Sequence, residues 1–136
     1  MKLEFLDDIS DNGKYPWADP DKLIRLYDFG HSEANRLIEI IQTRIIGNRT
    51  PVDLSKIDFI QPLNCNLRFE LSPINHGIDP DPDHNFTAYF TVEGYQTMIC
   101  YMSAFIGEEH DLAGYNWLYD PSINKIDLLF SPGGTW

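Results

Sequence analysis

The chain has 136 residues, of which 43% are hydrophobic and 13% aromatic, and its 21 acidic residues against 10 lysines and arginines give a formal net charge of −11. An apolar fraction of this size supports a folded core and argues against disorder over most of the chain. The negative charge disfavours binding to nucleic-acid phosphates or to an anionic membrane, and it favours basic partners. A chain of this length predicts one domain, which we place at residues 1–136.

Targeting and redox features of the sequence predict a cytoplasmic protein of bacterial type. The N-terminal segment becomes acidic within seven residues, which is not typical of a secretory leader. No apolar run reaches the roughly 18 residues that a membrane-spanning helix needs. Two cysteines do not make a disulfide framework, so we expect Cys65 and Cys100 to be buried, reduced thiols.

The first 30 residues predict two short strands with a loop between them. Residues 3–6 are apolar enough for a strand at a sheet edge, and residues 23–29 for a second strand. Segment 7–22 is rich in Asp, Gly and Pro, which is typical of a loop, and it contains Trp17. A tryptophan in such a loop usually packs against the core. An exposed tryptophan that recognises a partner is the alternative.

Helical spacing of apolar residues predicts a helix at residues 32–46. Ser32 is a suitable N-cap, and Glu33 lies in the first turn, where the helix dipole favours an acid. Gly47 is a suitable terminator. The apolar residues recur three and four positions apart, as they do on the buried face of an amphipathic helix. This face consists of Ala34, Leu37, Ile38, Ile41 and Ile45.

The middle of the chain predicts two more strands between connecting segments at 48–55 and 73–85. Residues 57–61 indicate a short strand that ends at Pro62, because proline cannot donate a ladder hydrogen bond. Residues 63–72 alternate most regularly between apolar and polar side chains. This pattern is typical of a strand that buries one face and exposes the other.

The longest apolar stretch, residues 86–106, changes its periodicity partway. Residues 86–91 alternate, which predicts a half-buried strand. From Glu93 onward a helical pattern fits better, with Thr91 as the N-cap and Gly107 as the terminator. A hairpin with its turn at Glu93 is the alternative. The apolar face of the helix would consist of Tyr95, Met98, Ile99, Met102, Phe105 and Ile106.

The C-terminal region predicts a β-hairpin. Residues 115–119 and 125–131 both alternate, and residues 120–124 can form the turn between them. Along the whole chain, runs of strands are therefore separated by single helices. This order predicts an α+β fold with a largely antiparallel sheet of about five to seven strands and two amphipathic helices.

Alternating carboxylates in one loop make the strongest case for a metal site. Asp79, Asp81 and Asp83 alternate with prolines, and His84 follows them. Carboxylates in this order can converge on a hard divalent cation, although the spacing is not that of an EF-hand. A metal-dependent hydrolase using this loop is therefore the alternative function. The sequence carries no GxSxG motif or phosphate-binding loop, and it predicts no other cofactor.

The main hypothesis is a non-enzymatic binding or regulatory protein for a basic protein partner, in the manner of an immunity protein or a chaperone. Nine acids and no lysine or arginine lie between Arg68 and Lys125, so this part of the chain is expected to attract a basic surface. Tryptophans are common anchors of protein interfaces. The residues expected to contact the partner are Trp17, Glu108, Glu109, Asp111 and Trp117.

Overall fold

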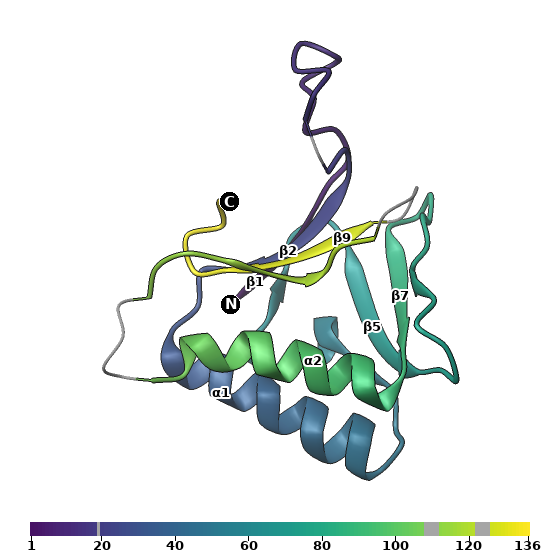
Figure 1. Cartoon of the computed structure of the whole chain (residues 1–136), viewed down its shortest axis with the longest axis vertical. Helices are drawn as coiled ribbons and strands as arrows, with labels where there is room; N and C mark the ends of the chain where they lie inside the picture. The colour runs from purple at the N-terminus through teal and green to yellow at the C-terminus, as the bar shows by residue number, and fades with distance from the viewer. Residues whose placement is uncertain (19, 108–111, 122–125) are drawn as a thin grey trace.

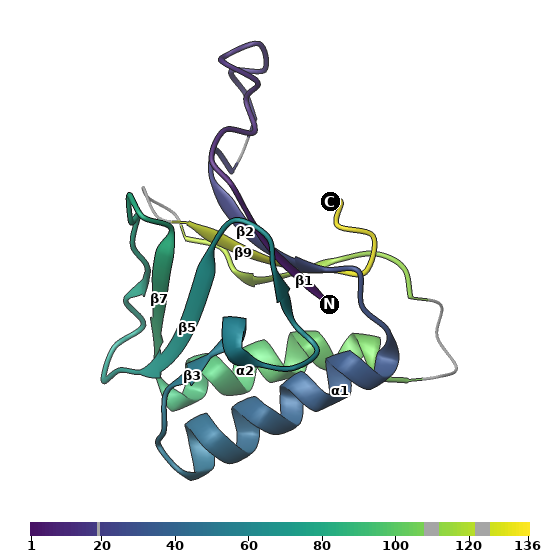
Figure 2. The same cartoon turned by 180° about the vertical axis from the view of Figure 1, so that it is seen from behind.

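The computed structural model describes residues 1–18, 20–107, 112–121 and 126–136. Within these ranges the chain forms two α-helices and two mixed sheets, of five and four strands, which confirms the predicted α+β class. The helices α1 (His31–Ile40) and α2 (Val92–Met102) lie side by side beneath the five-stranded sheet (Figures 1 and 2). The four-stranded sheet stands at one end of this arrangement. No described helix is long and apolar enough to cross a bilayer.

The five-stranded sheet mixes parallel and antiparallel neighbours. Across the sheet the strands are β4 (Gln61–Pro62), β1 (Lys2–Leu6), β2 (Leu23–Tyr27), β9 (Asp127–Ser131) and β8 (Asn116–Tyr119). β1 pairs antiparallel with β2 and parallel with β4, whereas β9 pairs parallel with β2 and antiparallel with β8. The predicted antiparallel pairing of the two C-terminal strands is confirmed by β8 and β9, whereas most of the predicted turn at residues 120–124 lies outside the described residues. The predicted edge position of the first strand is wrong, because β4 pairs with the outer side of β1.

The four-stranded sheet is also mixed, which corrects the prediction of one largely antiparallel sheet. Its strands in order are β3 (Val52–Asp53), β5 (Asn66–Leu71), β7 (Asn85–Phe90) and β6 (Gly77–Ile78). The two longer strands, β5 and β7, are parallel, and the two short edge strands pair antiparallel with them. The alternation predicted for both long strands is confirmed within β5 and β7, since Leu67, Phe69, Phe86 and Ala88 are all buried. The predicted start at residue 63 is wrong, because β5 begins at Asn66 and the Leu63 side chain is exposed.

The strand predicted at residues 57–61 is wrong. The chain instead forms a 3₁₀ turn, η2 (Leu54–Lys56), and a second turn in which the Ile60 amide donates to the Ile57 carbonyl at 3.0 Å. The two isoleucines are three positions apart, and the turn buries both of them. The strand β4 includes Pro62, whose missing N–H is tolerated at a sheet edge.

Helix α1 starts before the predicted cap, because Gly30 takes the N-cap position and Glu33 Oε2 accepts the Gly30 amide at 3.1 Å. The helix continues into a π-helical segment, η1 (Ile41–Gly47). The Asn48 amide donates to the carbonyl of Thr43, five residues earlier, at 2.9 Å. The predicted apolar face and the predicted end of the helix are confirmed.

Helix α2 follows β7 directly, which confirms the helical interpretation and rejects the hairpin. Thr91 is the N-cap, as predicted, and its Oγ1 accepts the Gly94 amide at 3.0 Å. The α-helix ends in a 3₁₀ turn, η3 (Ser103–Phe105), so the predicted end at Gly107 is too late. The residues that this helix and turn bury are Tyr95, Met98, Met102 and Phe105.

The two cysteines lie in different surroundings. Cys65 is buried, as predicted, and burial raises the pKa of its thiol to about 12. Cys100 is exposed on α2, so the prediction that it is buried is wrong. It lies on the polar side of the helix, away from the residues that pack into the core.

Candidate functional site

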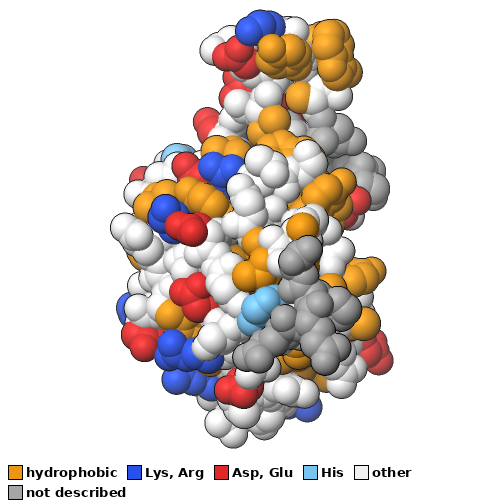
Figure 3. Space-filling view, turned by 90° about the vertical axis from the view of Figure 1, so that its left-hand side faces the viewer, with side chains coloured by type: hydrophobic (Ala, Val, Ile, Leu, Met, Phe, Trp, Pro, Cys, Tyr) orange, Lys and Arg blue, Asp and Glu red, His pale blue; other side chains and the backbone are white. Residues whose placement is uncertain are grey.

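The most prominent feature of the molecule is an arm between β1 and β2, of which the structure describes residues 7–18 and 20–22. The arm projects from the body on the side of the five-stranded sheet opposite the helices (Figures 1 and 2). Figure 3 shows that hydrophobic side chains gather at its tip. Because the arm contributes little to the core, its shape must come from its own hydrogen bonds.

Local hydrogen bonds give the arm a defined shape. The Asp8 carboxylate accepts the Ser10 amide at 2.8 Å and the Asn12 amide at 2.7 Å. The hydrogen bond from the Ser10 hydroxyl and the one from the Asn12 amide lower the pKa of Asp8. Further along, the Tyr15 amide donates to the Ser10 carbonyl at 2.8 Å. This network closes the turns that carry the tip.

Trp17 lies at the tip with 76% of its surface exposed. Its ring meets the Tyr15 ring edge to face, with 6.1 Å between the centroids, and the Lys14 ammonium lies 5.1 Å from the Tyr15 ring centre. The expectation that Trp17 packs against the core is therefore wrong: the side chain is exposed, and its role in recognising a partner stays a prediction. A large aromatic side chain in water lacks the stabilisation that its burial would give. The exposed Trp17 side chain is therefore a candidate for contact with another molecule.

A second aromatic surface lies on the same side of the five-stranded sheet as the arm. Trp117 on β8 pairs with Leu129 on β9, and both face away from the main core. The C-terminal tail folds over this face and places Trp136 against Trp117, with 6.1 Å between ring centroids. Arg25 holds the tail, since its Nη1 donates to the Gly134 carbonyl at 2.5 Å. Trp117 is therefore half-buried by the tail, in contrast to Trp17.

The acidic part of the predicted contact set cannot be placed, since Glu108, Glu109 and Asp111 lie outside the described residues. The two predicted tryptophans, Trp17 and Trp117, are both described and both lie on the side of the sheet opposite the helices.

The carboxylates of the predicted metal loop mostly form hydrogen bonds within the loop. The Asp81 carboxylate accepts the Asp83 amide at 2.8 Å and the Asn85 amide at 3.3 Å. Asp79 Oδ2 lies 2.5 Å from His76 Nε2. His84 stacks on the aromatic ring that follows it in β7 instead of turning toward the carboxylates. In the described part of the chain, no three His, Cys, Asp or Glu side chains are grouped so that they could hold a metal ion.

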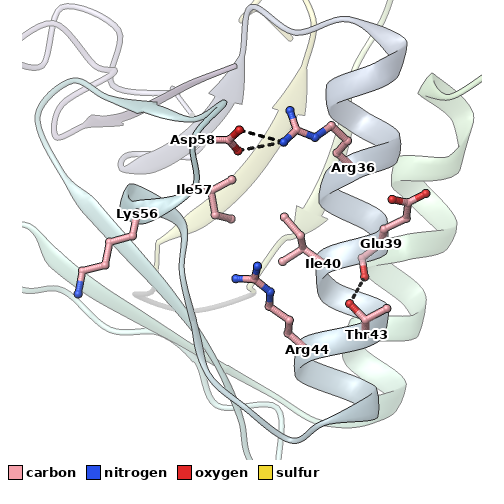
Figure 4. A pocket seen from close by; sticks show the side chains of 8 residues that line it. All are labelled: Arg36, Glu39, Ile40, Thr43, Arg44, Lys56, Ile57 and Asp58. Atoms are coloured by element: carbon pink, nitrogen blue, oxygen red, sulfur yellow. Dashed lines mark hydrogen bonds and ion pairs between the residues drawn. The ribbon is translucent and has the colours of Figure 1, made fainter.

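Sequence reasoning misses a hollow of about 490 Å³ between α1 and the segment that follows η2 (Figure 4). Three cationic side chains contribute to its lining, namely Arg36, Arg44 and Lys56. The available signal is the uneven charge, because most lysines and arginines lie in the first half of the chain. The spacing of the three cations gives no sign of a common site, since two are on a helix and one is on a distant turn.

Comparisons of this chain with protein-family models, with curated proteins and with solved structures find no match.

Proposed function

We propose that this chain is a non-enzymatic binding protein that docks on a basic protein partner, in the manner of an immunity protein or a chaperone. The observation that carries the proposal is the exposure of Trp17 at the tip of a hydrogen-bonded arm. Tryptophan and tyrosine are the residues most often found as interface anchors, because they bury a large area at a small loss of conformational entropy. Trp17 and Tyr15 together supply such an anchor.

The shape of the arm favours binding as a preformed element. Ordering a flexible loop on binding costs free energy, and a loop that is already ordered avoids this cost. The hydrogen bonds of Asp8 and Ser10 close the turns that carry the tip of the arm. We therefore expect the arm to enter a concave apolar site on the partner with little change in its own backbone.

The basic character of the partner follows from the charge of the chain. A net charge of −11 raises the rate of encounter with a positively charged surface. It also opposes binding to acidic proteins and to nucleic acids, because like charges placed together cost free energy.

Affinity capture with three versions of the chain tests this function. The baits are the wild type, Trp17→Ser and, as a matched control, Ile74→Ser, which removes a side chain that is 64% exposed elsewhere on the surface. We expect a basic protein to be retained by the wild type and by the control and to be lost with Trp17→Ser. Retention of the same proteins by all three baits would show that the arm is not the binding element.

A further inference from the structure

The hollow beside α1 lies in the most cationic part of an otherwise acidic chain. Residues 34–69 carry five of the ten lysines and arginines but only three of the 21 acids, a net charge of +2. The remaining residues carry five cations against 18 acids, a net charge of −13. The positive charge of residues 34–69 would repel a basic partner. We therefore expect the hollow to bind a negatively charged ligand.

Two guanidinium groups face this hollow from one helix. Figure 4 shows Arg36 and Arg44 extending from α1 and η1 toward the segment that carries Ile57. Arg36 Nη2 donates to both carboxylate oxygens of Asp58, at 3.0 and 3.1 Å, which fixes its guanidinium at one side of the opening. The same guanidinium lies over the Phe59 ring, 4.3 Å from its centre, and the N–H groups that do not contact Asp58 are the ones that a ligand would use.

Arg44 is the unused cation of the site. Its side chain makes no hydrogen bond or ion pair with any described residue, although most other cations of the chain are paired. It belongs to the π-helical segment η1, a kind of irregularity that is frequent at functional sites. Lys56 lines the opposite wall with its side chain 81% exposed, and its nearest acid, Asp53, is 3.7 Å away. Because this ion pair with Asp53 is largely exposed, it is weak, and a bound anion can compete for the ammonium group.

Between the two arginines the floor of the hollow carries two apolar side chains, whereas the rest of its lining is polar or charged. Ile40 and Ile57 face each other there (Figure 4), and Glu39, Thr43 and Asp58 complete the lining. A ligand that suits this surface carries a doubly charged oxyanion at one end and a small apolar body at the other. A guanidinium fork binds phosphate oxygens in pairs, which gives such an end both charge and directed hydrogen bonds.

We infer that this hollow binds a small phosphomonoester, with its phosphate on Arg44 and Arg36 and its apolar part on the two isoleucines. The site is separate from the arm and does not depend on the protein partner. The three cations contribute differently, because Arg44 supplies the main fork, Arg36 is held in place by Asp58, and Lys56 adds a mobile positive charge. The volume of about 490 Å³ matches that of pockets for small ligands.

Titration of the full chain with phenyl phosphate and with inorganic phosphate, followed by amide chemical shifts in nitrogen-15 NMR spectra, tests the inference. Sodium chloride at equal ionic strength is the reference. We expect saturable shifts confined to residues 36–44 and 56–58, and several-fold tighter binding of phenyl phosphate than of inorganic phosphate. Equal affinity for both would contradict the role of the apolar floor. Shifts scattered over all cationic residues would overturn the site.

Variants separate the site from general charge effects. Arg44→Gln is expected to weaken phenyl phosphate binding about tenfold or more, because it removes charged hydrogen bonds. Arg44→Lys, which keeps the charge without the fork, is expected to lie between Arg44→Gln and the wild type. Arg49→Gln is the matched control, since it makes the same change of charge at an exposed arginine outside the hollow. An equal loss with Arg44→Gln and Arg49→Gln, or no loss with either, would refute the inference.

Discussion

The side-chain amide of Asn64 pairs with both backbone groups of Phe5. Asn64 Oδ1 accepts the Phe5 amide and Asn64 Nδ2 donates to the Phe5 carbonyl, each at 2.8 Å. The side chain thus continues the pairing of β1 beyond the short strand β4, where the backbone of the chain has already turned away. One residue therefore supports the strand from which the arm departs.

The first prediction concerns this pair. Asn64→Ala leaves two partly buried backbone groups of Phe5 without their partners, so we expect it to lower the free energy of unfolding by about 1–3 kcal/mol. Asn66→Ala is the control, because the Asn66 side chain bonds only to Asn85 at the exposed face of β5, and a loss under about 0.5 kcal/mol is expected. Urea unfolding at neutral pH measures both, and equal losses would contradict the structural role of Asn64.

The second prediction concerns alkaline pH. Burial raises the pKa of Cys65 to about 12, whereas an unfolded thiol ionises near pH 8.5. Above that pH the unfolded chain holds fewer protons than the folded chain. The free energy of unfolding should therefore fall by up to about 1.4 kcal/mol per pH unit until the folded thiol also ionises.

Comparison of two alanine variants isolates this effect from other ionising groups. Cys65→Ala should flatten the alkaline fall in stability relative to the wild type, whatever constant loss its smaller side chain adds. Cys100→Ala should leave the pH dependence unchanged, because Cys100 is exposed. The measurement is urea unfolding at several pH values between about 8 and 11. The same slope in all three proteins would show that Cys65 is not protected from ionisation.

The third prediction concerns the loop of alternating aspartates. Asp81→Ala removes a carboxylate that accepts two backbone amides, and we expect a loss of about 1 kcal/mol in the free energy of unfolding. Asp83→Ala, at an exposed neighbour in the same loop, should cost less than about 0.5 kcal/mol. Thermal unfolding with added calcium, magnesium or zinc, and with a chelator, distinguishes the hydrolase alternative. A metal-dependent gain in stability that Asp81→Ala abolishes would favour a metal site over a purely structural loop.

Local structure can be predicted from the sequence where it depends on interactions between residues that are only a few positions apart. The Thr91 cap, the alternation of β7 and the apolar face of α1 depend on spacing within a few residues, and the sequence predicts all three. Residues 57–61 look like a strand because isoleucine and phenylalanine favour strands, whereas the spacing of three between the two isoleucines suits the turn that the chain forms. The parallel pairing of β2 with β9 joins residues about 100 positions apart, and short-range pattern carries no information about it.

The candidate sites are less predictable from the sequence than the elements are. Trp17 is identifiable as a possible anchor, but its exposure depends on how far the arm stands from the body, and composition does not determine this. The hollow of Arg36, Arg44 and Lys56 escapes prediction because it forms only when the turn after β3 packs against α1. Charge segregation along the chain is visible in the sequence, yet the position of the opening requires the fold.

The final prediction separates binding from folding at the arm. Trp17→Ser should change the free energy of unfolding by less than about 0.5 kcal/mol, because the side chain contributes nothing to the core. Chemical denaturation measures this directly. A loss of several kcal/mol would mean that Trp17 packs against the body in solution.

Binding kinetics of the captured partner test the central claim most directly. The rate constants are measured for the wild type, Trp17→Ser and Ile74→Ser over a series of salt concentrations. The association rate constant should fall as salt rises, since the screening length is only about 10 Å at 0.1 M. Trp17→Ser should raise the dissociation rate constant about tenfold or more, and Ile74→Ser should not. A partner that associates at the same rate at every salt concentration, and that leaves Trp17→Ser no faster than the wild type, would contradict the account.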